Sequence, residues 1–159
     1  METAGGSIRL GQIDGIVVAE TAGGGIEVES ARAVVRAGSV MGPIKLGRIA
    51  GPVRAETGAG NIVATLTADR ASWAESTLGT HMGDVVVYIP ADLAMTIHAT
   101  IDAAVSRQAI RSDFPLVFRN LAAWRGMQEL IGEAQVNGGG PSLRIRTTVG
   151  KIEIIKVSK

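Results

Sequence analysis

The chain has 159 residues, and its 16 Lys and Arg against 15 Asp and Glu give a formal net charge of +1. This near balance argues against nucleic-acid binding, which usually leaves a clear excess of positive charge. Cysteine is absent, which excludes disulfides and thiol chemistry, and no run of about 20 apolar residues is present that could cross a membrane. We expect one domain, residues 1–159, with a core of small and branched aliphatic side chains.

Residues 1–73 form a regular repeat in which an apolar residue recurs at every ninth position and a second follows two residues later. The first series is Ile8, Val17, Ile26, Val35, Ile44, Val53, Ile62 and Ala71, and the second is Leu10, Ala19, Val28, Ala37, Leu46, Ala55, Ala64 and Trp73. Such apolar alternation is typical of short strands with every other side chain facing inward. The repeat therefore predicts an all-β parallel β-helix, or solenoid, with two strands in each rung of about 18 residues.

Glycines recur in the same register, because Gly6, Gly24, Gly42 and Gly60 each stand two residues before an isoleucine of the repeat. A coil this short must turn sharply at fixed points, so we interpret these glycines as its corners. A phosphate-binding loop at residues 23–25 is the functional alternative. It is disfavoured because neither a helix nor a Lys-Ser/Thr pair follows.

Charged residues also follow the repeat. Arg9, Glu27 and Lys45 occupy one outward series with alternating sign, and Glu20 and Glu56 occupy another. We interpret this pattern as a solvated surface whose neighbouring charges pair with one another. The alternative, a charged face that binds a polyanion, is disfavoured by the mixed signs and the low net charge.

Beyond residue 73 the repeat is looser. Residues 74–116 are expected to form irregular rungs that include a strand at 85–89 ending at Pro90. Residues 134–159 carry the Gly-x-Ile-x-Ile pattern again, and they are expected to form the final rungs.

Between these two parts, residues 117–133 have apolar residues at helical spacing and predict a short amphipathic helix inserted before the last rungs. Phe118, Leu121, Trp124 and Ile131 would form its apolar face. We expect this face to cap the open end or the side of the solenoid, or to pack on a second subunit. A docking surface for another chain is the alternative.

Candidate chemistry is sparse. His81 and His98 have no carboxylate at metal-ligand spacing, and the repeats lack the Asp that calcium-binding nonapeptides need. We therefore expect no catalytic residue, no metal and no cofactor. The enzyme alternative is a polysaccharide-processing β-helix, for which Asp69, Glu75 and Asp84 are the candidate carboxylates.

Four phrases together resemble a known family. They are the repeated ETxGGxIxV, DVVVYIPADLAMTIHATI at 84–101, SDFPL at 112–116 and GGGPSLRIRTTVGKIEIIK at 138–156. In this order they resemble the bacterial putative-adhesin domain of unknown function, a right-handed β-helix, over most of the chain. Residues 117–133 depart from that pattern. The resemblance implies a non-catalytic cell-envelope or surface scaffold, or an adhesin-like binding module, and it provides no catalytic motif to transfer.

The expected partners follow from the same resemblance. We expect an unidentified protein or glycan, no nucleic acid, no direct membrane insertion, and possible homo-oligomers formed through a solenoid end or the inserted helix. The expected location is the cell envelope or the extracellular space. Because Glu2 already stands in register with Glu20 and Glu56, we also expect earlier rungs and a secretion signal or membrane segment upstream.

Overall fold

The computed structural model describes residues 2–67, 74–91, 93–104, 110–114, 116–124 and 127–157, without the side chains of residues 103, 104, 119–124, 127 and 128. Ala71 and Trp73, the last members of the two apolar series, lie outside the described residues.

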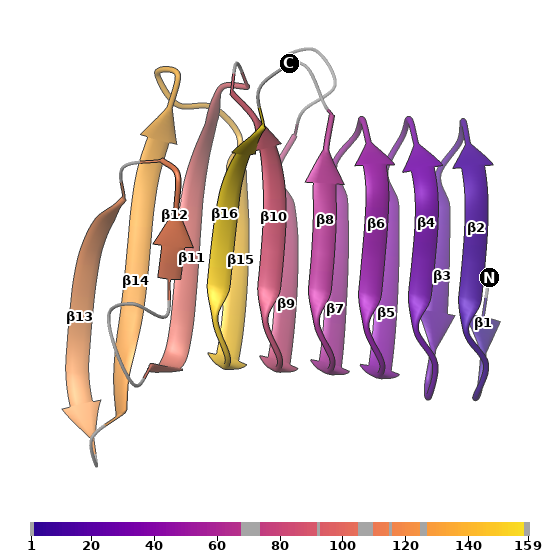
Figure 1. Cartoon of the computed structure of the whole chain (residues 1–159), viewed down its shortest axis with the longest axis horizontal. Coiled ribbons are helices and arrows are strands. Elements are labelled where there is room, and N and C mark those ends of the chain that lie inside the picture. Colours follow the sequence, from indigo (N-terminus) through magenta and orange to yellow (C-terminus); the bar gives the residue numbers. More distant parts are fainter. Residues whose placement is uncertain are drawn as a thin grey trace.

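Within the described residues, two sheets lie face to face and the first half of the chain alternates between them (Figure 1). Sheet A comprises, in spatial order, β1 (Glu2–Thr3), β3 (Val17–Thr21), β5 (Val35–Met41), β7 (Val53–Ala59), β9 (Ser76–Met82), β15 (Ser142–Val149), β11 (Met95–Ala104), β14 (Met127–Val136) and β13 (Val117–Trp124). Sheet B comprises β12 (Ile110–Ser112), β16 (Ile152–Val157), β10 (Val85–Pro90), β8 (Ile62–Leu66), β6 (Ile44–Ile49), β4 (Ile26–Ala31) and β2 (Ile8–Ile13). The predicted all-β class is confirmed, and two sheets with mostly parallel pairing are consistent with a β-solenoid-like fold.

The repeat sets the register of both sheets. In sheet B, Ile26 is the direct neighbour of Ile8, and Ile44 is the neighbour of both Ile26 and Ile62. In sheet A, Val35 lies between Val17 and Val53 in the same way. All of these side chains are buried. Identical residues therefore stack in columns, and the core lies between the sheets.

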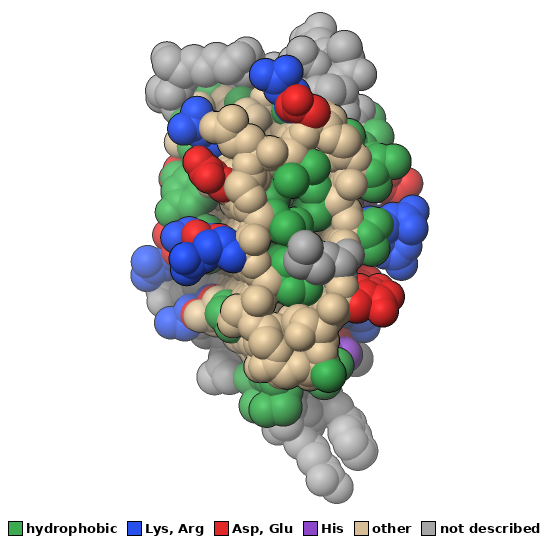
Figure 2. Space-filling view, turned by 90° about the vertical axis from the view of Figure 1, so that its right-hand side faces the viewer, with side chains coloured by type: hydrophobic (Ala, Val, Ile, Leu, Met, Phe, Trp, Pro, Cys, Tyr) green, Lys and Arg blue, Asp and Glu red, His purple; other side chains and the backbone are tan. Residues whose placement is uncertain are grey.

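The end that carries β1 and β2 shows this arrangement directly (Figure 2). Hydrophobic side chains lie in the middle, between two walls of backbone and polar side chains, and most charged side chains lie outside these walls. This is the distribution that alternation predicts for strands with one buried and one solvated face.

The C-terminal strands do not lie at the end of the stack. In sheet A, β15 pairs on one side with β9 and on the other with β11, and both pairings are parallel. In sheet B, β16 lies between β10 and β12. The last residues of the chain thus separate strands that precede them in the sequence.

The predicted helix at 117–133 is wrong. This segment forms β13 and most of β14, an antiparallel hairpin in which Phe118 is the partner of Gly132. Strand β14 also pairs with β11 along most of its length, so its backbone groups gain partners on both sides. The residues of β14 follow a period of two, because Leu130, Gly132, Ala134 and Val136 are buried while Ile131, Glu133 and Gln135 are more exposed. This alternation outweighs the helical spacing.

The recurring Thr and Gly of the repeat have a structural role at the turns that lead from the strands of sheet A to those of sheet B. Within the described residues, a hydroxyl in one layer donates a hydrogen bond to the carbonyl oxygen of a glycine in the layer before it. These bonds are Thr21 to Gly6, Ser39 to Gly24, Thr57 to Gly42, Thr80 to Gly60 and Thr147 to Gly83, at 2.9–3.0 Å. The prediction that these glycines form corners is confirmed for the column that contains Gly24, Gly42 and Gly60.

Replacing Gly42 with Ala should lower the free energy of unfolding by about 2 kcal/mol or more. Gly42 has a φ of 151°, and an added Cβ would lie 2.4 Å from the carbonyl oxygen of Gly24. The matched control is Gly38→Ala, because a Cβ at Gly38 would meet no atom closer than 3.9 Å. Urea unfolding monitored by circular dichroism measures both changes. Equal midpoints for the two variants would contradict the steric explanation.

Candidate functional site

A shallow, open groove of about 870 Å³ crosses strands β1, β3, β5 and β7 and ends at β9 in sheet A. It is lined by Glu2, Thr3, Ala4, Glu20, Thr21, Ala22, Gly38, Ser39, Val40, Glu56, Thr57, Gly58 and His81. The lining residues repeat from strand to strand, because β1, β3, β5 and β7 each contribute the same two or three positions, whereas β9 contributes His81 alone.

One wall of the groove is acidic. In the sheet register, Glu20 lies between Glu2 and Gly38. Gly38 in turn lies between Glu20 and Glu56. Because strands are about 4.8 Å apart, Glu20 and Glu56 stand about 9.6 Å from each other. Gly38 leaves the space between them without a side chain.

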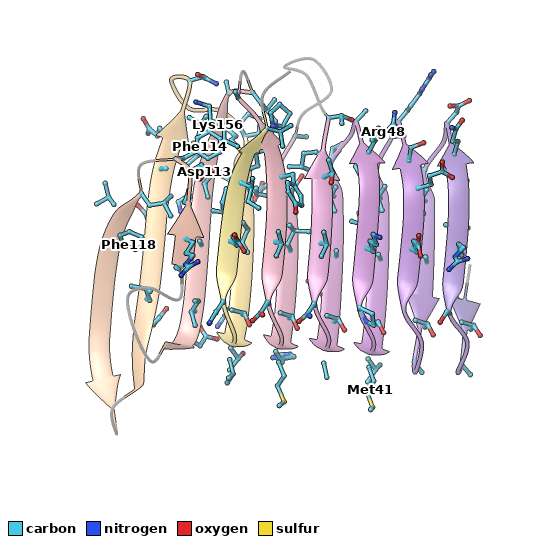
Figure 3. All side chains as sticks on the ribbon, viewed as in Figure 1. Met41, Arg48, Asp113, Phe114, Phe118 and Lys156 are labelled. Carbon is cyan, nitrogen blue, oxygen red and sulfur yellow. The ribbon has the colours of Figure 1, made fainter. Side chains whose placement is uncertain are left out.

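The opposite wall is apolar. Val40 lines the groove with 62% of its surface exposed. Directly beside it lies a row that we call the apolar ridge: Met41, Ala59, Met82 and Val149, which are neighbours in register on four successive strands. Met41 and Met82 are 63% and 64% exposed, and Met41 projects from the lower end of its layer (Figure 3). Four adjacent exposed apolar residues form a continuous strip along the stack.

The carboxylates of the groove differ in how they are paired. Glu56 Oε1 lies 3.9 Å from Arg54 Nε, a long contact between two exposed groups. Among the described residues, no Lys or Arg nitrogen lies within the 4.0 Å of an ion pair from Glu2 or Glu20. In contrast, Glu27 on the outer face of sheet B is paired with Arg9 at 3.6 Å, as the alternating charges predict. Glu2 and Glu20 are therefore the carboxylates of the groove without an ion pair among the described residues, while Arg36 and Arg54 stand in register two residues before Gly38 and Glu56.

The four residues predicted to form a capping face are not all on one face. Phe118 points toward the core side, where its ring packs on Gly132, and it remains 42% exposed. Ile131 is adjacent to Gly132 in the strand and is therefore on the opposite face, beside Thr100. The side chains of Leu121 and Trp124 lie outside the described residues.

Phe114, which is not one of the four predicted capping residues, is a buried aromatic residue at this end of the stack. Its backbone N–H donates to Ser112 Oγ, and the adjacent Asp113 Oδ2 accepts a hydrogen bond from the Lys156 N–H at 2.9 Å (Figure 3). Leu116 packs on the core from the same loop and contacts Gly132. The SDFPL phrase thus brings Phe114 and Leu116 onto the core at the end that lies away from β1.

The candidate carboxylates of the enzyme alternative have structural contacts. Glu75 Oε1 lies 3.5 Å from Arg144 Nη2, and Asp84 Oδ1 accepts a hydrogen bond from the Lys151 N–H at 2.9 Å. Asp69 lies outside the described residues. Within the part of the chain that the structure describes, no group of three or more His, Cys, Asp or Glu side chains could hold a metal ion.

Comparison of the chain with protein-family models, with curated proteins and with solved structures gave no match. Among the described residues there is also no helix long and apolar enough to cross a membrane. The groove is therefore the candidate functional site on the described surface. Sequence reasoning placed Glu20 and Glu56 on its face but missed Gly38, Val40 and His81.

Proposed function

We propose that this protein is a non-catalytic binding module or scaffold of the bacterial cell envelope or surface, and that it holds an extended ligand in the groove of sheet A. The observation that carries the proposal is the groove itself. It crosses successive strands and presents a Glu followed by a Thr on β1, β3 and β7, with Gly38 and Ser39 in the same positions on β5. A surface that repeats at each strand spacing suits a ligand that is itself long and repetitive.

We also propose that the chain coils as a right-handed β-solenoid with rungs of about 18 residues. The pairing of Ile8 with Ile26, of Ile26 with Ile44 and of Ile44 with Ile62 supports this rung length in the first half. The next neighbour of Ile62 is Val85, so this step between neighbouring strands is five residues longer than the others. The resemblance to the putative-adhesin domain supports the handedness and the location in the envelope.

Filling the groove should abolish binding without unfolding the protein. We expect Gly38→Trp to reduce binding to purified envelope material from the producing bacterium by about ten-fold or more, because the indole would occupy the space between Glu20 and Glu56. A side chain at Gly38 has room to leave the backbone, since its Cβ would lie 3.9 Å from the nearest atom. Cosedimentation with the envelope fraction measures the effect.

Gly11→Trp is the matched control, because Gly11 lies on β2 in the other sheet and its Cβ would also meet nothing closer than 3.9 Å. This variant should bind like the wild type. A wild-type protein that does not cosediment with envelope material, or a Gly38→Trp variant that binds fully, would refute the proposal.

A further inference from the structure

We propose that the ligand of this groove is an extended cationic polypeptide segment in which apolar side chains alternate with Lys or Arg. This inference rests on the proposed binding function and adds the chemical class of the partner. It is carried by two independent properties of the same part of sheet A: an exposed apolar ridge at the ends of β5, β7, β9 and β15, and a row of carboxylates on β1, β3 and β7.

The apolar ridge supplies the first argument. Val40, Met41, Met82 and Val149 are each more than half exposed, although most other large apolar side chains among the described residues are buried. Exposed apolar residues are ordinary when they are scattered, but a contiguous strip beside a groove is typical of an interaction surface. Methionine is suited to this role because its flexible side chain adapts to partners of different shape.

The charge of the groove decides which apolar partner fits. A segment that covered Val40 would bring its neighbouring side chains next to Glu20 and Glu56, and Glu20 has no ion pair among the described residues. Positive side chains at these positions would gain favourable contacts, whereas a negatively charged polymer or an anionic membrane would be repelled. Charge complementarity therefore favours a cationic peptide over a nucleic acid or an anionic lipid surface.

The dimensions agree with an extended chain. The distance from Glu2 on β1 to His81 on β9 covers four strand spacings, or about 19 Å. An extended peptide rises about 3.3 Å for each residue, so about six residues would fill this length. One set of alternate side chains of such a peptide would face the carboxylates of β1, β3 and β7, and from β5 onward the other set would face Val40 and the adjacent apolar ridge.

The test uses the full chain and a fluorescein-labelled octapeptide of sequence Lys-Leu-Lys-Ser-Lys-Leu-Lys-Ser with an amidated end. Binding is followed by fluorescence anisotropy at low and at high NaCl concentration. We expect saturable binding to the wild type that weakens as salt rises, and no binding of the counterpart peptide with Glu in place of Lys.

Two double variants separate the contributions. Glu20→Gln/Glu56→Gln should weaken binding about ten-fold at low salt and less at high salt, while Met41→Ser/Met82→Ser should weaken it by a similar factor at both salt concentrations. The matched control is Glu27→Gln/Glu153→Gln, which removes the same charge from the outer face of sheet B. It should bind the octapeptide within about two-fold of the wild type.

Equal affinity for the Lys and Glu peptides, or unchanged affinity of Glu20→Gln/Glu56→Gln, would overturn the inference. So would binding to vesicles of phosphatidylglycerol that Gly38→Trp abolishes. These results are distinct from a failure of the proposed function: if Gly38→Trp abolishes envelope binding but the Lys peptide does not bind, the groove binds another class of ligand. If envelope binding is also absent, both proposals fall.

Discussion

Replacing Ile44 with Asp should leave the protein unfolded at room temperature. Ile44 is fully buried in β6 between Ile26 and Ile62, its neighbours in register. The change removes an aliphatic side chain worth about 1.5–3 kcal/mol and places a carboxylate where no cation is available, which costs several kcal/mol more. This total is comparable to the whole stability of a typical domain, about 5–15 kcal/mol.

Far-UV circular dichroism and thermal melting measure this effect. The matched control is Arg48→Asp, which introduces the same side chain into the same strand at an exposed position. It should fold and melt cooperatively, within a few degrees of the wild type. An Ile44→Asp protein that melted like Arg48→Asp would contradict the stacked isoleucine column.

Ending the chain after Gly140 should have an effect of similar size, although it removes only C-terminal residues. The deletion takes out β15 and β16, which lie between strands on both sides in sheets A and B. Leu143, Ile145, Ile152 and Ile154 are buried, and their burial is worth together about 6–12 kcal/mol. Strands β9 and β10 would also lose their hydrogen-bonded neighbours on one side.

We expect the shortened chain to lose cooperative melting and to exchange its amide hydrogens rapidly in β9, β10 and β11. Its control is a chain ending after Val157, which retains all of β16 and should behave like the wild type. If the shortened chain still melted cooperatively with slow exchange in β11, then β11 would be able to pair directly with β9. The insertion of β15 would then contribute little to stability.

The groove was only partly accessible to sequence reasoning. The 18-residue spacing placed Glu20 and Glu56 outward in one series, and the sheet register agrees with that placement. The groove itself depends on the lack of a side chain at Gly38, which occupies the position between the two carboxylates. The 18-residue repeat makes Met41 and Ala59 neighbours, but it did not indicate that Met82 would lie beside Ala59, because five extra residues precede β9.

The first half of the fold was determined by the sequence alone. Alternation decides which side chains of a strand face inward, and a constant repeat brings identical side chains together, so Ile8, Ile26 and Ile44 have one favourable register. A shift of one residue would turn every one of them to the solvent. Local pattern and global packing agree here, and the regular repeat was therefore sufficient.

Only the tertiary structure decided the second half. The phrase at Thr147–Lys156 carries the same pattern as the earlier rungs, so the pattern does not say between which strands it lies. Its place between β9 and β11 depends on which strands are left without neighbours once the whole chain has packed. Residues 117–133 were ambiguous for a related reason. Their apolar residues fit a helical period, but the unpaired edge of β11 needed a partner strand, and a hairpin supplied it.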